Sequence, residues 1–473
     1  MFFSLRRAVR PAALLALLPL AAAVPSSQPL QGAQPDPQVI QQFGLYSNPA
    51  LQAYISRQGK AMTTISDRPG DYGFTIVDSP IINAFATPDG HVYFTRGIMA
   101  YFNDEAQFTG VLGHELGHIT ARHGQKQQTR STLTSLGLLL GSVVSPNVVG
   151  RLAQPLSQGI GVLFLKYSRD NENEADALGV KYSTKTGYDA SHMASFFQTL
   201  ERTEQQSGGS GVPTFLSTHP NSADRYQRVK GLAAQAQQSL NKTSLKVNRD
   251  SYLRSLDGLV FGDDPRQGFV EGSVFYQPEL KLRLPVPSSW KTENTPAQFQ
   301  MSEPGGNAVL VFTNAPAGTV TAAATSVAKQ IGLASAQAQN TTINGFPAVT
   351  FEGDQAASST SSSSTPAHVR GYVIQDGQTN YALLGLAPTA SFGTYAPQFD
   401  QTAQGFQRLT DAARLNRQPD RIRVKQVKTA TTLRQALAAN GVPSARLEEL
   451  AIVNGMQLTD QLPAGTLFKV VGK

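Results

Sequence analysis

The sequence predicts an α+β protein with three folded units, and three patterns along the chain carry this prediction. Residues 36–240 combine apolar residues at helical spacing with one strand-like passage, which indicates a mainly helical domain with a small sheet. Residues 250–412 alternate short strand-like runs with turns of Pro, Gly and Asn, which indicates an α+β domain built on an antiparallel sheet. Residues 421–473 have the order strand, helix, helix and strand, which predicts a small βααβ unit.

Composition limits the chemistry that the chain can carry. Its 473 residues are 40% hydrophobic, which is enough for several buried cores. The absence of cysteine excludes disulfides, thiol nucleophiles and Cys-ligated metals, so any metal must be held by His and carboxylates. The net charge of +7 falls to +4 once Arg6, Arg7 and Arg10 are removed with the leading segment described next. This excess is too small to indicate a nucleic-acid partner.

The first 23 residues have the pattern of a secretory signal peptide. A basic region precedes an apolar stretch at residues 12–20, and Ala21-Ala22-Ala23 then resembles an A-x-A cleavage site. A retained membrane anchor is the alternative, but the apolar stretch is shorter than the ~20 residues that a span needs. The sequence therefore predicts an exported protein of the periplasm or cell envelope.

The motif with the most specific chemistry is His114-Glu115-Leu116-Gly117-His118, within a predicted helix at residues 105–123. Histidines four residues apart share one helix face, so both imidazoles can reach one metal ion. Glu115 lies near enough to act as general base on a water molecule. The motif predicts one Zn²⁺ per chain, with His114 and His118 as ligands; a chance match is the alternative.

A catalytic zinc site needs a third protein ligand, and residues 167–176, within a second predicted helix, offer one. Glu172 and Asp176 are four residues apart on one face of this helix. We therefore expect Glu172 to bind the metal and Asp176 to accept a hydrogen bond from a ligating histidine. Glu174 faces elsewhere and is expected at the surface.

A further apolar stretch at residues 133–149 is interrupted by Gly137, Gly141, Ser145 and Pro146. These interruptions favour a buried helix or hairpin over a membrane span. At most a peripheral membrane contact is expected here.

Together, the motifs resemble the CAAX-prenyl-protease/HtpX-like family of zinc metallopeptidases, of gluzincin type, and its exported members without transmembrane helices in particular. The matching segments are residues 83–86, 93–97, 113–124 and 167–179, and Ser217-Thr218-His219-Pro220 with Arg225. The resemblance covers about residues 40–235. After residue 250 the chain departs from a tetratricopeptide layout and contains Pro285-Val286-Pro287-Ser288-Ser289-Trp290 instead, like a less characterised group of exported metalloproteases.

The resemblance implies a zincin-type fold for residues 36–240 and an endopeptidase that acts on polypeptides, such as unfolded or misassembled envelope proteins. It implies catalytic roles for His219 and Arg225, either of which would stabilise the oxyanion, although His219 in an ordinary loop is the alternative. It also places Asn83 and Ala84 on an edge strand that pairs with an extended substrate. His123 is expected to be a packing or helix-end histidine.

A rival interpretation comes from another functional class. The chain would be a non-proteolytic envelope binding protein or chaperone, or a latent enzyme, in which an extra histidine keeps the metal site closed. Serine-hydrolase chemistry has little support, because the sequence contains no G-x-S-x-G motif.

The second domain is expected to contain strands at residues 281–286, 308–313, 348–352 and 381–386 and a helix at residues 320–331. Its Ser-rich loop, residues 356–366, is too biased in composition to pack and receives no function. Residues 414–434 form a basic neck, for which a solvated surface is the simplest interpretation.

The C-terminal unit is expected to contain strand 422–427, helix 432–440, helix 445–454 and a final strand within residues 462–471. This order, with Val453-Asn454-Gly455 and Leu462-Pro463-Ala464-Gly465, resembles a LysM module. The usual G-D-T turn is replaced by Ala430-Thr431-Thr432. The resemblance implies peptidoglycan as a partner; the alternative is a unit that simply docks on the first domain.

Overall fold

The computed structural model describes residues 34–124, 167–206, 214–219, 224–333, 337–355 and 367–473. The predicted signal peptide, the apolar stretch at residues 133–149 and the Ser-rich loop lie outside these residues. Within them, helices combine with mainly antiparallel sheets, which confirms the predicted α+β class. None of the helices in the described part of the chain has the length and hydropathy to cross a bilayer.

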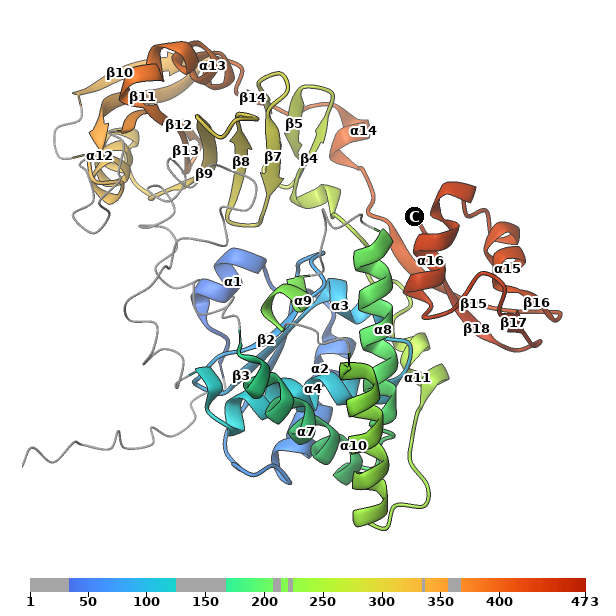
Figure 1. The fold of residues 1–473 in the computed structure, drawn as a ribbon. Coiled ribbons are helices and arrows are strands. Elements are labelled where there is room, and N and C mark those ends of the chain that lie inside the picture. The colour runs from blue at the N-terminus through green and yellow to red at the C-terminus, as the bar shows by residue number, and fades with distance from the viewer. Residues whose placement is uncertain (1–33, 125–166, 207–213, 220–223, 334–336, 356–366) are drawn as a thin grey trace, which may run out of the picture.

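The first unit, at the bottom of Figure 1, packs helices around one small sheet. Its helices are α1 (Pro37–Phe43), α2 (Pro49–Thr63), α3 (Arg96–Tyr101), α4 (Glu105–Thr120), α7 (Arg169–Lys185), α8 (Ser191–Gln206), α9 (Thr214–Thr218), α10 (Arg225–Ser239) and α11 (Arg249–Ser255). Its strands are β1 (Gly73–Val77), β2 (Ala84–Ala86) and β3 (His91–Thr95). The strand order is β1-β3-β2, so β2 forms an edge of the sheet and runs antiparallel to β3.

Helices α4 and α7 cross closely because each carries a glycine at the contact. A Cβ atom on Gly113 would lie 2.8 Å from the carbonyl oxygen of Gly179, and a Cβ on Gly179 would lie 2.8 Å from the backbone nitrogen of His114. Such distances leave no room for a side chain. The N-cap Asp104 accepts a hydrogen bond from the Gln107 N–H, and this cap fixes the start of α4. Both glycines therefore bring the polar face of α7 against the histidines of α4.

Helix α11 belongs to the first unit, although the sequence placed residue 250 in the second domain. Tyr252 and Leu256 are buried in the same hydrophobic core as Phe108. The Tyr252 hydroxyl donates to the carbonyl of Met99 over 3.1 Å. The first unit therefore extends beyond residue 250. A helix of only seven residues with two buried apolar side chains is stable only when it packs against a neighbouring core.

The second unit, at the top of Figure 1, is built on a seven-stranded antiparallel sheet of order β10-β11-β12-β13-β9-β8-β7. These strands are β7 (Lys291–Asn294), β8 (Gln298–Ser302), β9 (Val309–Ala315), β10 (Gln337–Ile343), β11 (Phe346–Gln355), β12 (Ala367–Asp376) and β13 (Thr379–Pro388). Helices α12 (Val320–Gln330) and α13 (Phe392–Gln404) pack in two separate hydrophobic cores, one on each face of the sheet.

A smaller sheet of order β14-β6-β5-β4 completes the second unit. Its strands are β4 (Phe269–Glu271), β5 (Val274–Gln277), β6 (Leu282–Pro285) and β14 (Gln407–Arg408), with η2 (Pro265–Gln267), η3 (Thr389–Ser391) and α14 (Ala412–Leu415) as connections. Near this sheet, the Arg96 guanidinium of the first unit donates to the Gly262 carbonyl over 2.6 Å.

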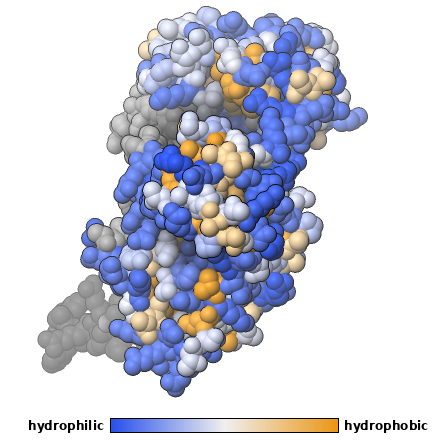
Figure 2. Space-filling view, turned by 90° about the vertical axis from the view of Figure 1, so that its right-hand side faces the viewer, coloured by the Kyte–Doolittle hydropathy of each residue, from blue (hydrophilic) through white to orange (hydrophobic). Residues whose placement is uncertain are grey.

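The C-terminal unit has the expected strand, helix, helix and strand order. Its elements are β15 (Arg421–Gln426), β16 (Thr431–Thr432), α15 (Leu433–Ala439), η4 (Ser444–Arg446), α16 (Leu447–Val453), β17 (Gln461–Leu462) and β18 (Leu467–Gly472). Strands β15 and β18 pair antiparallel. Figure 2 looks onto the face of the molecule that carries this unit, and that face is largely hydrophilic with small separate hydrophobic areas.

The apolar side of the C-terminal unit is packed against the first unit. Leu437, Leu450 and Phe468 share one buried core with residues of the first unit. The backbone of β15 also pairs with the chain after α11, because Ile422 N–H donates to the Leu259 carbonyl over 2.8 Å. Lys469 is fully buried, and its ammonium group donates to the carbonyls of Ala100 (2.7 Å) and Phe102 (3.0 Å) at the end of α3.

Candidate metal centre

Four side chains from three parts of the first unit converge in its interior. His114 and His118 come from α4, Glu172 comes from the first turn of α7, and His219 follows α9 directly. Each of the four residues is at most 2% exposed. One potential metal-binding atom from each residue lies within 4.8 Å of the others. The described residues thus form a His-His-Glu-His cluster that could hold a metal ion.

The spacing within the cluster fits a tetrahedral zinc ion. The Nε2 atoms of His114 and His118 are 3.1 Å apart, and His219 Nδ1 is 3.2 Å from His114 Nε2. Glu172 Oε1 is 3.4 Å from His118 Nε2. Ligands at roughly 2.0–2.1 Å from a tetrahedral zinc ion are separated by about 3.3 Å, close to these distances. Because the chain contains no cysteine, zinc would have to be bound by histidines and carboxylates, and the cluster consists of three histidines and one glutamate.

Asp176 orients His114 from behind the cluster. Its Oδ1 atom lies 3.0 Å from His114 Nδ1, so that nitrogen donates and Nε2 keeps its lone pair for the metal. Burial alone would raise the pKa of Asp176, but Arg225 and His114 outweigh it and hold the pKa well below its usual range. Asp176 therefore stays ionised as an acceptor.

The geometry of Arg225 differs from the expected oxyanion donor. Its Nε and Nη2 atoms donate to the two carboxylate oxygens of Asp176, over 3.0 and 2.7 Å. Nη1 contacts the His219 carbonyl at 3.4 Å, and the guanidinium lies 4.0 Å from the ring centre of Phe197. The side chain is buried behind the cluster with its donors engaged. This geometry favours a positioning role over the expected catalytic role, because Arg225 holds Asp176 and contacts the backbone of His219.

Glu115 lies beside the cluster without belonging to it. Its carboxylate is fully buried, and neither oxygen accepts a hydrogen bond from the described residues. The nearest basic group is His219, whose Nε2 is 3.6 Å from Glu115 Oε1. Burial raises the pKa of Glu115. A carboxylate with free lone pairs and a raised pKa is suited to take up and return a proton.

His123 has a contact that the sequence did not reveal. Its Nδ1 atom lies 2.9 Å from His118 Nδ1, and its Nε2 lies 3.2 Å from Glu174 Oε2. A chain of hydrogen bonds from His118 through His123 to Glu174 would fix the orientation of the His118 ring. Arg122 makes this possible with a φ of 59°, a left-handed conformation that turns the chain back after α4. Helical periodicity cannot predict such a turn.

Asn83 and Ala84 lie at the edge of the small sheet. The Thr95 N–H donates to the Asn83 carbonyl over 3.1 Å, and Ala84 is paired with Phe94. Because hydrogen-bonding groups alternate along an antiparallel strand, the backbone groups of Ala84 and Ala86 face away from β3. Asn83 is buried, and its Oδ1 has no hydrogen-bond partner among the described residues.

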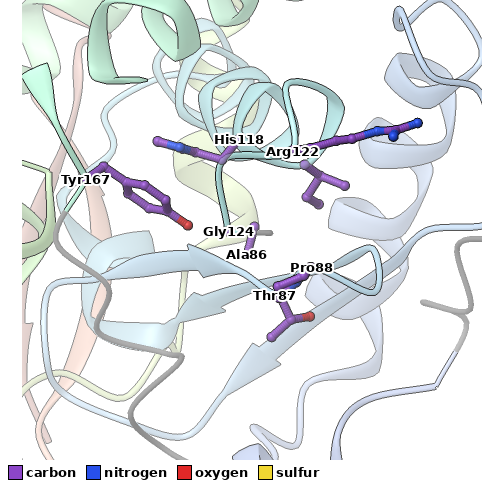
Figure 3. A pocket seen from close by; sticks show the side chains of 8 residues that line it. Ala86, Thr87, Pro88, His118, Arg122, Gly124 and Tyr167 are labelled. Carbon is purple, nitrogen blue, oxygen red and sulfur yellow. The ribbon is translucent and has the colours of Figure 1, made fainter. Parts of the chain in front are cut away.

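A small pocket lies between β2 and the end of α4 (Figure 3). It is lined by Ala86, Thr87, Pro88, His118, Ile119, Arg122, Gly124 and Tyr167. The ring of Tyr167 stacks on that of His118, with centres 3.9 Å apart. Burial, together with the charges of Glu115 and Glu172, raises the pKa of Tyr167, so its hydroxyl stays protonated.

Comparison with known proteins finds similarity within the first unit. Residues 49–233 match the model of peptidase family M48. The chain is 30% identical over 238 residues to metalloendopeptidase OMA1, mitochondrial, of Bos taurus, covering 48% of this chain and 43% of that protein. It is 28% identical over 199 residues to the beta-barrel assembly-enhancing protease of Escherichia coli K12, covering 40% of each. The chain thus spans about two fifths of these relatives.

Among solved structures, CyanoP of Synechocystis sp. PCC 6803 matches with 14% identity and a TM-score of 0.24. The match covers 30% of this chain and 96% of that protein.

Proposed function

We propose that the peptidase family M48 domain at residues 49–233 makes this chain a zinc-dependent endopeptidase of the bacterial cell envelope. The observation that carries the proposal is the position of Glu115. Its two oxygens, which accept no hydrogen bond from the described residues, lie beside a buried cluster of three imidazoles and one carboxylate. That combination pairs a metal-binding group with a free proton acceptor.

The mechanism follows from what each side chain can do. A zinc ion held by His114, His118 and Glu172 would supply Lewis-acid activation of a water molecule and of the peptide carbonyl. Glu115 takes a proton from the attacking water and returns it to the nitrogen of the leaving amine. Asp176 and Arg225 hold the ligands in place. An extended substrate would pair with the outer backbone groups of Ala84 and Ala86.

Hydrolysis of an unfolded polypeptide tests this proposal. Purified full-length protein should cleave casein or a denatured envelope protein, lose this activity with a chelator and regain it when zinc is restored. A serine-protease inhibitor serves as the control and should have no effect. Chelator-insensitive cleavage, or no cleavage of several unfolded substrates, would contradict the proposal.

A latent enzyme or non-proteolytic binding protein is the second candidate, and His219 supports it. Its Nδ1 lies 3.2 Å from His114 Nε2 and 3.0 Å from Glu172 Oε1, where it could occupy the fourth position of the metal. A tetrahedral zinc site with four protein ligands leaves no position for water. Turnover would then require His219 to move away.

Replacing His219 by alanine should change the rate of hydrolysis while zinc content stays near one per chain. If His219 closes the site, the rate rises; if it assists the reaction, the rate falls. The measurement is initial rate on two unfolded substrates beside metal analysis. His192→Ala, a half-buried histidine that contacts Asp104 instead, is the matched control. A His219→Ala protein that matches wild type on both substrates would make His219 a loop residue only.

Localisation in the envelope rests on the predicted signal peptide, and peptidoglycan remains a predicted partner of the C-terminal unit. Because this unit is packed on the first unit, the full chain is the appropriate test protein. It should sediment with purified sacculi at low salt and be released by soluble glycan fragments. If it stays in the supernatant, the predicted partner is wrong and the unit has a structural role.

A further inference from the structure

Tyr167 has no role in the chemistry described so far, yet it is fixed against two residues of the metal cluster. Its ring stacks on His118 at an angle of 24° and lies 5.6 Å from the ring of His219. Its backbone N–H donates to the carbonyl of Thr218 over 3.2 Å, directly before His219. The residue is therefore held in a defined position at the start of α7.

The hydroxyl of Tyr167 points into the small pocket between α4 and β2, toward Ala86 and Gly124 (Figure 3). The residue keeps 8% of its surface exposed, whereas Glu115 is fully buried. A substrate paired with the outer edge of β2 would pass between this strand and the metal cluster. On such a path, the substrate would pass the Tyr167 hydroxyl.

The reaction needs a hydrogen-bond donor beside the scissile carbonyl. Attack on a peptide carbonyl moves negative charge onto the carbonyl oxygen, and a preorganised donor aimed at that oxygen lowers the barrier. Arg225 cannot supply the donor because its groups bind Asp176 and the His219 backbone. The His219 Nδ1 atom is directed at His114 and Glu172, and its Nε2 atom lies 3.6 Å from Glu115 Oε1.

We propose that Tyr167 is a further catalytic residue, whose hydroxyl donates a hydrogen bond to the oxygen of the tetrahedral adduct. This inference rests on the proposed endopeptidase function. A bond forms between the water oxygen and the carbonyl carbon, the carbonyl π pair moves onto its oxygen, and Glu115 takes the water proton. When the C–N bond breaks, that pair restores the carbonyl and the proton goes to the amine.

The variant Tyr167→Phe tests the role of the hydroxyl, because it preserves the ring that stacks on His118. Loss of one donor to the adduct should lower kcat about 10²-fold, with KM changed by less than about threefold. Tyr188→Phe is the matched control. It removes a hydroxyl of the same unit that donates to Gln58 over 3.3 Å and does not line the pocket. This control should keep the wild-type kcat.

Calorimetry separates a catalytic from a structural role. A phosphonamidate peptide has a tetrahedral phosphorus that resembles the adduct. Its dissociation constant should be higher for Tyr167→Phe than for wild type, by the same factor by which kcat falls. The variant's affinity for a product peptide, its zinc content and its midpoint of thermal unfolding should stay unchanged. An unchanged kcat, an effect on KM alone, or loss of zinc would overturn the inference.

The two proposals fail in distinguishable ways. A wild-type protein without chelator-sensitive hydrolysis would contradict the endopeptidase function and this inference with it. An active wild type with an equally active Tyr167→Phe variant would contradict only the role of Tyr167.

Discussion

The variant Glu115→Gln should keep one zinc ion per chain but hydrolyse unfolded polypeptides about 10²–10⁴-fold more slowly than wild type. Glutamine has the shape of Glu115 but cannot take a proton, and Glu115 lies outside the four-residue cluster. Metal analysis of the purified protein and initial rates at saturating substrate measure the two effects separately. Loss of zinc, or a rate within tenfold of wild type, would contradict the assignment of Glu115 as general base.

Glu172→Ala should lose the metal instead. Removing this carboxylate leaves three imidazoles with no carboxylate in the cluster. It also removes an ion-pair partner of Arg225, whose Nη2 lies 3.2 Å from Glu172 Oε2. The zinc dissociation constant should rise by more than the roughly 10–100-fold that an outer hydrogen-bond partner costs. Asp170→Ala is the control, because this carboxylate lies in the first turn of the same helix with an exposed side chain. Full zinc occupancy of Glu172→Ala in a metal buffer would rule out Glu172 as a ligand.

The part of the site that sequence could predict is set by helix geometry alone. His114 and His118 share one face of α4 because they are four residues apart, and Glu172 and Asp176 share one face of α7 for the same reason. The structure brings these four residues together. Spacing within a helix does not depend on the rest of the fold, so the pattern is visible before any packing is known.

The remaining contacts depend on how the helices pack, which spacing does not specify. Arg225 opens α10, and its direction is decided by Phe197 on α8 and by Asp176 on α7. His123 turns toward His118 only because Arg122 is left-handed. The resemblance to a family predicted that His219 and Arg225 belong to the site. It could not predict their contacts, which indicate whether a residue positions a ligand or takes part in catalysis.

Lys469 illustrates the same limit for the fold. A lysine in a strand is expected to point toward water, and the sequence offers no sign of the two carbonyls at the end of α3 that bind it. Those carbonyls are available because a helix ends with unpaired C=O groups. Burial lowers the pKa of Lys469 well below its usual value. The sequence therefore leaves two alternatives for the C-terminal unit, peptidoglycan binding and docking on the first unit, and does not decide between them.

Replacing Lys469 by alanine should lower the free energy of unfolding by about 2–5 kcal/mol. The change leaves a cavity in the shared core and removes the donor from the carbonyls of Ala100 and Phe102. Denaturant unfolding, followed by circular dichroism, measures the loss. Lys425→Ala is the matched control, because Lys425 lies on the neighbouring strand β15 with an exposed side chain. The control should change stability by less than about 0.5 kcal/mol.

The shared core also predicts how the C-terminal unit unfolds. Leu450 and Phe468 belong to the same buried cluster as Phe108 of α4, so the unit cannot separate without exposing apolar surface of the first unit. The C-terminal and first units should therefore unfold in one cooperative transition, and Lys469→Ala should move that transition as a whole. If the C-terminal unit melts separately in wild type, or if Lys469→Ala is as stable as Lys425→Ala, its contacts with α3 do not stabilise the fold.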